Sequence, residues 1–407
     1  GGLSMEVLLE DYQRLVSQLG DVYQRNIYSS LTSDHRIVGI VGPRGIGKTT
    51  YILNFLKAHY LHNQQALYVS ADDLFFSDNK LLDLARDFIN HYDGKLLCID
   101  EIHKYPNWAQ ELKNIYDKFP NLKIIFSGSS SINLTKEKYD LSRRAILKYL
   151  PGLSFREFLE IKLGEKFPIL SLTEIVDNGA EIAANLTPVP KLPGWFDEYL
   201  QIGYYPLFNN HEKHEDIYLA LMGIIEKGIY IDIPSYYKIR STTLPLFKKI
   251  LQFIYSSPPS SINVHKIAKS LKKDHSDIAK YIEMLRESGL LRFLLIDKTG
   301  HALIRNTEKI YLNNTNLFYA IENELRKGIN KGSIRELFAL TCLDNANLKP
   351  AFSKVGDLKC QNLIFEIGGK NKTTKQIKGV ENSFLLLDDI LIGSKKVIPL
   401  YLLGFLY

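Results

Sequence analysis

The 407-residue chain is poor in cysteine and has no long apolar run. Its three cysteines, Cys98, Cys342 and Cys360, are odd in number and far apart, so they form neither a disulfide framework nor a metal-ligand spacing. No stretch of about eighteen apolar residues is present, which argues against a membrane span. The first residues also lack the basic and then apolar pattern of a secretory signal. These absences predict a cytoplasmic protein with reduced, buried cysteines and no membrane partner.

The length and the changes of pattern along the chain predict several domains. A chain of this size exceeds one ordinary domain and suggests two or three. Strands alternate with helices up to about residue 150, and a mostly helical region with a proline-rich insertion follows. A breaker at Ser256–Ser260 marks a further boundary. We therefore expect a core domain over residues 1–150, a helical lid over 151–240, and two smaller domains over 241–310 and 311–407.

Short apolar runs alternate with amphipathic segments over the first 150 residues. The expected strands cover residues 37–41, 66–69, 96–99, 124–126 and 146–150. The expected helices cover residues 51–60, 81–91 and 108–119, after a segment with helical periodicity within 5–34. Strands that alternate with helices predict a parallel sheet with helices on both faces, which is an α/β fold.

The first expected strand leads into a loop that matches the pattern G-x-x-x-x-G-K-[ST] without a mismatch. The loop consists of Gly42, Pro43, Arg44, Gly45, Ile46, Gly47, Lys48 and Thr49, and Thr50 follows it. Glycines let such a loop curl so that its backbone N–H groups point inward at phosphate oxygens, and the positive end of the next helix faces the same anion. We expect Lys48 to reach the β- and γ-phosphates and Thr49 to place its hydroxyl on Mg²⁺. Residues 42–50 are therefore the predicted site for a nucleoside triphosphate.

Two acids follow the third expected strand. Asp100 and Glu101 end an apolar run, and a strand this apolar has no use for carboxylates unless they point into a site. Asp100 is placed to hold the hydration shell of Mg²⁺, and Glu101 to orient and deprotonate an attacking water. The next strand ends in serines, one of which could sense the γ-phosphate or position that water. Ser129 is the preferred candidate over Ser127.

A pair of arginines, Arg143 and Arg144, precedes the fifth expected strand. A guanidinium can supply the extra positive charge that phosphoryl transfer needs, and it often comes from a neighbouring subunit. The alternative is an ordinary surface pair, and the sequence leaves both interpretations open. The first interpretation would imply a homo-oligomer.

The order of these motifs carries a resemblance. The loop at 42–49, the run Asp100-Glu101-Ile102-His103 and the run Phe126-Ser127-Gly128-Ser129-Ser130 resemble the ATPases of the AAA+ class. Three later runs resemble one prokaryotic branch of that class: Leu153-Ser154-Phe155-Arg156-Glu157-Phe158, Gly203-Tyr204-Tyr205-Pro206 and Asp232-Ile233-Pro234. The resemblance implies a P-loop NTPase core with a five-stranded parallel αβα sheet and a helical lid, then a winged helix and a small α/β domain of nuclease-like outline. It also implies ATP and ADP as ligands, with Mg²⁺ as the metal.

The segment 241–310 has the outline of a winged helix. Two expected helices, 264–271 and 277–288, are separated by a polar turn, and an expected β-hairpin over 290–295 and 302–305 follows. Helix–turn–helix spacing with a hairpin after it is typical of this module.

The last segment, 311–407, is similar in outline to restriction endonucleases. That resemblance implies a glutamate on a helix, an aspartate on a strand and a Glu-x-Lys run, for which the candidates are Glu336, Asp357, Glu366 and Lys370. Lys370 follows Glu366 by four residues rather than two, and residues i and i+2 of a strand share a face. We therefore expect a degenerate, inactive nuclease-like domain.

The basic excess of the chain is concentrated in residues 235–300, which hold twelve Lys or Arg against five Asp or Glu. Lys272, Lys273 and Arg292 are usable for contacts to phosphates, whereas the acids of the candidate recognition helix disfavour base reading. Three interpretations stay open for this segment: a packing module, sequence-independent contact with double-stranded DNA, or a protein partner.

The sequence as a whole predicts an enzyme that hydrolyses ATP, with Mg²⁺, to drive a conformational change. One alternative is a nucleotide-gated switch with slow turnover, in which the bound state presents the C-terminal domains. A second alternative is an ATPase that acts on double-stranded DNA. The sequence does not specify the biological process or the client.

Overall fold

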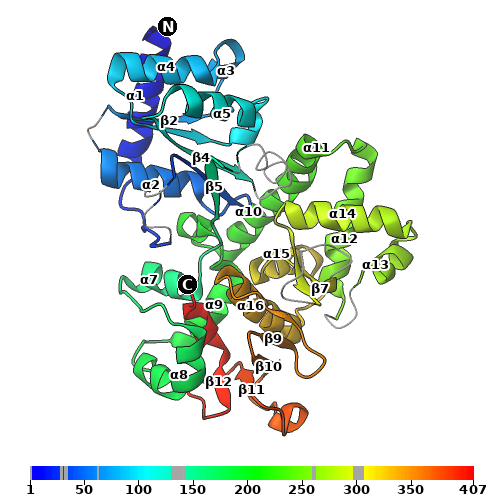
Figure 1. Cartoon of the computed structure of the whole chain (residues 1–407). Coiled ribbons are helices and arrows are strands. Elements are labelled where there is room, and N and C mark those ends of the chain that lie inside the picture. Colours follow the sequence, from blue (N-terminus) through cyan, green and yellow to red (C-terminus); the bar gives the residue numbers. More distant parts are fainter. Residues whose placement is uncertain are drawn as a thin grey trace. The chain divides into compact units, whose positions relative to one another are not determined.

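The computed structural model describes residues 2–27, 31, 35–61, 64–129, 141, 143–258, 263–296 and 307–407. The chain divides into two compact units, Gly1–Pro151 and Gly152–Tyr407, which are drawn in Figure 1. Among the described residues, the model contains no helix whose length and apolarity would suffice to cross a membrane.

The first unit is built on a five-stranded parallel sheet in the order β2-β3-β4-β1-β5. Its strands are β1 (Ile37–Gly42), β2 (Ala66–Ser70), β3 (Leu96–Asp100), β4 (Lys123–Ser129) and β5 (Ala145–Tyr149). Its helices are α1 (Gly2–Gln18), α2 (Lys48–Tyr60), α3 (Phe75–Asp78), α4 (Leu81–Tyr92) and α5 (Trp108–Lys118). The predicted parallel α/β sheet is thereby confirmed, and each of its five strands lies within a few residues of the expected range.

The strand order places helices on both faces of this sheet. The connection through α2 runs from β1 outward to β2, whereas the connections through α4 and α5 return from β2 to β3 and from β3 to β4. Right-handed crossovers that run in opposite directions lie on opposite faces of a sheet. Accordingly, Figure 1 shows α4 and α5 on one side of the strands and α2 on the other.

The N-terminal helix is shorter than its periodicity suggested. The expected helical segment extends over 5–34, but α1 ends at Gln18 and the described residues 19–27 are not helical. Gly20 has φ +66°, a left-handed conformation that glycine adopts readily and that ends a helix. A glycine therefore overrides the helical pattern here.

The second unit combines helices with a seven-stranded mixed sheet. The helices are α7 (Phe155–Leu163), α8 (Leu172–Leu186), α9 (Leu192–Ile202), α10 (His214–Lys227), α11 (Ile233–Tyr236), α12 (Leu244–Ser256), α13 (Val264–Leu271), α14 (His275–Glu287), α15 (Thr315–Leu325) and α16 (Lys331–Asn345). The strands are β6 (Leu291–Leu295), β7 (Thr307–Leu312), β8 (Ala351–Phe352), β9 (Leu358–Cys360), β10 (Leu363–Gly368), β11 (Ser383–Leu387) and β12 (Val397–Pro399). The proline-rich insertion expected after residue 150 contains α8.

One sheet extends through the segments expected to be separate domains. Its order is β12-β11-β10-β9-β8-β6-β7. The antiparallel pair β6–β7 is joined to the five strands from β8 through β12 by a parallel pairing of Leu295 on β6 with Ala351 on β8. The expected hairpin strand at 302–305 lies outside the described residues, and the described partner of β6 is β7. The boundaries at 240 and 310 and the lid over 151–240 stay predictions.

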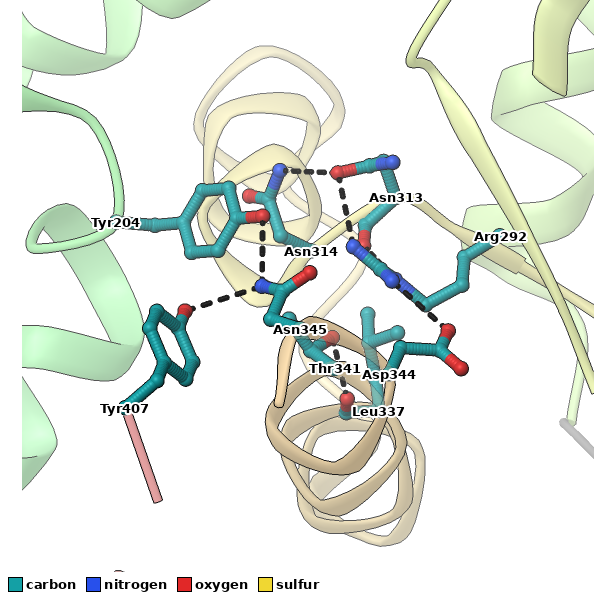
Figure 2. A network of polar contacts seen from close by, with 9 residues as sticks. All are labelled: Tyr204, Arg292, Asn313, Asn314, Leu337, Thr341, Asp344, Asn345 and Tyr407. Carbon is teal, nitrogen blue, oxygen red and sulfur yellow. Dashed lines mark hydrogen bonds and ion pairs between the residues drawn. The ribbon is translucent and has the colours of Figure 1, made fainter. Parts of the chain in front are cut away.

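Helix α16 lies at the centre of the second unit and is buried along most of its length. Figure 2 shows the polar groups at its C-terminal end. Asn345 donates hydrogen bonds to the hydroxyls of Tyr204 (3.3 Å) and Tyr407 (3.0 Å). On the other side Arg292 forms an ion pair with Asp344 at 2.9 Å and donates from Nε to the carbonyl of Asn313 at 2.8 Å. These bonds connect β6, α16 and the C-terminus of the chain.

The motif runs after residue 150 have structural roles in this unit. Ser154 and Glu157 form a reciprocal capping box at the start of α7. A Cβ on Gly152 would come within 2.2 Å of the ring of Tyr204, so the glycine is needed for the ring to pack there. The runs that carry the resemblance therefore specify helix ends and packing.

The ion pair of Arg292 gives a prediction about stability. Arg292→Met should lower the free energy of unfolding of the second unit by about 2–3 kcal/mol, below the ~3–5 kcal/mol of a fully buried pair. The value is smaller because the Asp344 side chain is 31% exposed. The two tryptophans are Trp108 and Trp195, so urea unfolding followed by fluorescence in a Trp108→Phe background reports the second unit.

The matched control is Lys249→Met, which removes an exposed cation from α12. Its unfolding free energy should change by less than about 0.5 kcal/mol. Equal losses in the two variants would contradict a stabilising role for the Arg292–Asp344 pair.

Candidate nucleotide-binding site

The loop between β1 and α2 has the backbone shape that its glycines permit. Gly45 and Gly47 have φ +84° and +96°, and a Cβ on Gly42 would lie 2.7 Å from the carbonyl oxygen of Leu150. The ammonium of Lys48 donates to the carbonyls of Gly42 (2.7 Å) and Pro43 (2.8 Å), so it lies over the loop. Because α2 begins at Lys48, its first backbone N–H groups have no acceptor inside the helix and are directed toward the same loop.

Asp100 is the point where three hydroxyl groups meet at the end of β3. Its side chain is buried, with the residue 4% exposed, and Oδ2 accepts a hydrogen bond from Thr49 Oγ1 at 2.5 Å. Tyr68 also donates to Oδ2, and Ser127 donates to Oδ1. The structure therefore brings the predicted metal-binding residues Thr49 and Asp100 into direct contact.

The sequence did not indicate Tyr68 as a residue of the site, and it ranked Ser127 below Ser129. Tyr68 lies in an otherwise apolar strand, and burial, followed by the charge of Asp100, raises the pKa of its hydroxyl. Ser127 is 1% exposed and also accepts a hydrogen bond from the backbone N–H of Glu101 at 2.9 Å. The available signal was a hydroxyl inside an apolar β-strand beside the acid-bearing strand, because a buried hydroxyl needs a partner.

Ser129, the preferred serine, lies at the end of β4 and opposite Gly42 in the register of β1 and β4. Its position places it next to the loop, whereas Ser127 lies beside the acid. The pairing of β3 with β4 confirms that the serine-bearing strand neighbours the acid-bearing strand.

Glu101 adopts a left-handed conformation, with φ +52° and ψ +50°, which is uncommon for a residue with a side chain. Burial raises its pKa, and the charges of Asp100 and Asp72 raise it further, while Lys104 and Arg44 oppose the shift. The strained backbone redirects the chain at the point where β3 ends.

Arg143 and Arg144 lie at the other edge of the sheet. Ala145, which follows them, pairs with Ile37 at the start of β1, whereas the predicted phosphate-binding loop at 42–49 follows the end of β1. Arg144 forms an ion pair with Asp117 at 3.3 Å. The structure therefore does not bring these arginines to the loop of their own chain.

The basic segment 235–300 is partly neutralised inside the second unit. Arg292, expected to be usable for phosphate contacts, is instead 8% exposed and bound to Asp344. This expectation was wrong because the side chain points into the fold, toward α16. Two further cations pair internally, Arg286 with Glu283 and Glu287, and Lys248 with Glu226 and Glu324. The exposed lysines of α13, the following turn and α14 are Lys266, Lys269, Lys272, Lys273 and Lys280.

The nuclease-like candidates also come together in part. Glu336 and Asp357 are neighbours, and burial, which outweighs the opposing charge of Lys309, raises the pKa of Glu336 to about 7. The lysine that contacts Glu366 is Lys372, at 2.9 Å, whereas the expected Lys370 is exposed.

Two parts of the chain match known families. Residues 34–159 match the family described as AAA domain, and residues 194–328 match a domain of unknown function, DUF8612. An AAA domain implies nucleotide binding, in agreement with the position of the loop within the first match. The acid cluster around Glu336 and Glu366 lies outside both matched ranges.

Individual proteins are also similar to this chain. The uncharacterized protein MJ1637 of Methanocaldococcus jannaschii is 27% identical over 305 residues, which is 71% of this chain and 63% of that protein. Among solved structures, the Orc1 protein of Aeropyrum pernix in complex with DNA covers 77% of this chain and 92% of its own, at 14% identity and a TM-score of 0.29. AMPPCP-bound DnaA of Aquifex aeolicus covers 68% and 86%, at 18% identity and a TM-score of 0.24.

The hydroxyl contacts of Asp100 give a second prediction. Ser127→Ala should lower the free energy of unfolding of the first unit by about 1–2 kcal/mol, because Asp100 Oδ1 and the Glu101 N–H each lose a partner and keep only the 3.2 Å hydrogen bond between them. Urea unfolding followed by Trp108 fluorescence in a Trp195→Phe background measures this. Ser129→Ala, two residues along the same strand and half-buried, is the control and should cost less. A larger loss for Ser129→Ala would refute the assignment.

Proposed function

We propose that the chain binds ATP with Mg²⁺ at residues 42–50 and hydrolyses it to ADP and phosphate. The observation that supports this most is the 2.5 Å contact between Thr49 and Asp100. It joins Thr49, which follows Lys48 at the start of α2, to the carboxylate of Asp100 at the end of β3. In the sheet, β3 lies two positions from β1, the strand that precedes the loop. A glycine loop, a helix N-terminus and a carboxylate that converge in this way form a site for a polyphosphate and its metal.

The oxygen atoms of Thr49 and Asp100 fit Mg²⁺, which prefers oxygen ligands and often uses one or two carboxylates beside phosphate oxygens. When bound, Mg²⁺ supplies positive charge next to the β- and γ-phosphates. Lys48 would exchange its two carbonyl acceptors for phosphate oxygens, because a hydrogen bond between two charged groups is stronger. Residues 42–47 would contribute backbone N–H groups, and Thr50 the N–H of the first helical turn.

Glu101 is the proposed general base. It would take a proton from the water that attacks the γ-phosphorus, while the bond to the bridging oxygen breaks and ADP leaves. A pKa raised by burial improves the carboxylate as a base near neutral pH. Ser127, bound to the Glu101 backbone, would fix the position of this residue, and Ser129 is proposed to contact the γ-phosphate or the water.

Arg143 or Arg144 is proposed to act on the nucleotide of a second copy of the chain. Their place at the opposite edge of the sheet supports a contribution in trans over one in cis. The alternative function, a slow-turnover switch, applies if no such arginine reaches the phosphates. Turnover per subunit that increases with protein concentration favours the ATPase, and turnover that is slow at every concentration favours the switch.

Two substitutions test the nucleotide site. Lys48→Ala should abolish binding of Mg-ATP, because the loop loses its ammonium. Glu101→Gln should keep binding and reduce turnover at least ~100-fold, as expected for loss of a general base. Calorimetry measures binding and phosphate release measures turnover.

Lys118→Ala, an exposed lysine at the end of α5, is the control and should leave both quantities unchanged. Turnover in Glu101→Gln equal to that of the parent chain would remove Glu101 from its proposed role. Unchanged affinity in Lys48→Ala would remove the whole site.

We also propose contact with double-stranded DNA as a second function. Three helices, α12 to α14, followed by the antiparallel strands β6 and β7 have the outline of a winged helix. Five exposed lysines lie on α13, the turn and α14. Because Arg292 and Arg286 are bound internally, the contact would be made by these lysines and would be independent of sequence.

Charge reversal at the turn tests this contact. Lys272→Glu with Lys273→Glu should weaken binding to a random-sequence duplex about tenfold at low salt and reduce its salt dependence. Lys80→Glu with Lys118→Glu changes the net charge equally in the first unit and should have a smaller effect. Fluorescence anisotropy across a salt series measures both. Equal weakening by the two pairs would reject the α13–α14 surface as the binding face.

A further inference from the structure

The carboxylate of Asp100 has a hydrogen-bond donor at each of its acceptor positions. Oδ2 accepts from Thr49 Oγ1 at 2.5 Å and from the hydroxyl of Tyr68. Oδ1 accepts from the hydroxyl of Ser127 and, at 3.2 Å, from the backbone N–H of Glu101. A carboxylate offers about four such positions on its two oxygens. The protein itself therefore saturates Asp100, and a metal ion or a metal-bound water can engage this side chain only after one donor has left.

The two donors on Oδ1 are bound to each other as well as to the carboxylate. Ser127 is 1% exposed, and its hydroxyl accepts a hydrogen bond from the Glu101 N–H at 2.9 Å. That N–H belongs to the left-handed residue that follows β3. Release of either donor would disturb more than one buried hydrogen bond, which is costly. The donor that leaves is therefore one of the two on Oδ2.

Thr49 can stay bound to Asp100 while it serves as a metal ligand. A hydroxyl group carries one O–H and two lone pairs, so its proton can remain on Oδ2 while its oxygen faces a cation. Thr49 lies in the first turn of α2, directly after Lys48, at the helix end where the phosphates are proposed to bind. The contact between Thr49 and Asp100 is therefore compatible with a bound metal.

Tyr68 reaches the carboxylate from the other side of β3. In the described sheet, β2 lies at the edge next to β3, whereas β1 and the loop lie on the opposite side of β3. Tyr68 pairs with Cys98, two residues before Asp100, and its long side chain spans this offset to meet Oδ2. The phenol thus comes from an element that forms no part of the loop, of α2 or of the turn after β3. Its release leaves the other three contacts of Asp100 in place.

The phenol also lowers the strength with which Asp100 can hold a metal ion. A hydrogen bond between a hydroxyl and a carboxylate contributes more than one between two neutral groups. Because the metal-bound state must give up this bond, its loss opposes metal binding. Without the Tyr68 hydroxyl, one position on Oδ2 would be open from the start.

We propose that the Tyr68 hydroxyl competes with Mg²⁺ for Oδ2 of Asp100. It holds the carboxylate in the metal-free protein and gives way when nucleotide and Mg²⁺ bind. The competition weakens the hold on Mg-ADP, the proposed product, and so shortens the time for which the product stays bound. The inference rests on the proposed nucleotide site, in which Tyr68 is a positioning residue because it acts through Asp100.

The gain in ADP affinity that Mg²⁺ provides tests this competition. Tyr68→Phe removes one hydroxyl and keeps the ring. The variant should show a gain about tenfold larger than the parent chain, because a hydrogen bond to a charged group no longer has to be broken. Calorimetric titration of ADP in excess Mg²⁺ and in EDTA measures the gain, and the affinity in EDTA should not change. A gain equal to or smaller than that of the parent chain would overturn the competition.

Tyr105→Phe is the matched control. Tyr105 and Tyr68 are both 7% exposed and both belong to the first unit, but the Tyr105 hydroxyl accepts from the backbone N–H of Leu81. This variant should keep the parent gain. An equal increase in the two variants would show a general effect of losing a buried phenol, which contradicts the assignment. Circular dichroism verifies folding, and Tyr68→Met is the second variant without the hydroxyl if Tyr68→Phe does not fold.

The release rate of a fluorescent ADP analogue gives a second readout. In Mg²⁺, Tyr68→Phe should release the analogue about tenfold more slowly than the parent chain, since affinity differences between related complexes lie mostly in dissociation. In EDTA the two rates should be equal. Slower release in EDTA as well would show that the phenol acts on the nucleotide pocket itself, and would contradict competition for the metal.

Nuclear magnetic resonance of tyrosine labelled with ¹³C at Cζ observes the hydroxyl directly. The Tyr68 signal is identified by its loss in Tyr68→Phe. It should shift when ADP and Mg²⁺ are added to the parent chain, and it should stay in place with ADP in EDTA. A Tyr68 signal that does not respond to Mg²⁺ would refute the release of its hydrogen bond.

The outcomes separate this inference from the proposed function. If Mg²⁺ tightens ADP binding equally in the parent chain and in Tyr68→Phe, the nucleotide site stands and the competition is refuted. If the parent chain binds no ADP under either condition, the nucleotide site and the competition are both refuted.

Discussion

The convergence of three hydroxyl groups on the carboxylate of Asp100 is the interaction on which the site of the first unit depends. The hydroxyls belong to Thr49, Tyr68 and Ser127, which come from α2, β2 and β4. A buried carboxylate is costly unless its oxygens are satisfied, so these partners make it tolerable at the end of an apolar strand. They also fix the first turn of α2, and with it the loop, relative to the sheet. The geometry of the loop therefore depends on a residue about fifty positions further along the chain.

The sequence predicted the part of this site that is written in local patterns. The loop, the helix after it and the acids at the end of β3 follow from glycine positions, periodicity and an apolar run that ends in carboxylates. Tyr68 and Ser127 could not be identified in the same way, because their contacts with Asp100 arise only when β2 and β4 are placed on either side of β3. The roles of the loop residues stay predictions, as does the choice of Ser129.

In the second unit, the difference between what local sequence patterns predict and what only the fold brings together is larger. Helices α13 and α14 were predicted from their apolar faces, and α13 has the predicted bounds. The sheet could not be predicted, because β8 and β9 are only two and three residues long. They form part of a sheet only by pairing that includes strands far away in the chain. Arg292 was misjudged for this reason: in sequence it is one cation in a basic segment, whereas in the fold it lies against α16. Lys372 was missed because spacing along a strand is a poor guide where the chain turns.

The continuous sheet of the second unit has a mechanical consequence. Strand β7 pairs with β6 directly after α14, and it carries Lys309 and Tyr311, both of which contact Glu336. The lysine-bearing helices α13 and α14 and the carboxylate of Glu336 are thus both connected to the strand pair β6–β7. A displacement of α13 and α14 would therefore be transmitted along β6 and β7 to the Glu336 carboxylate.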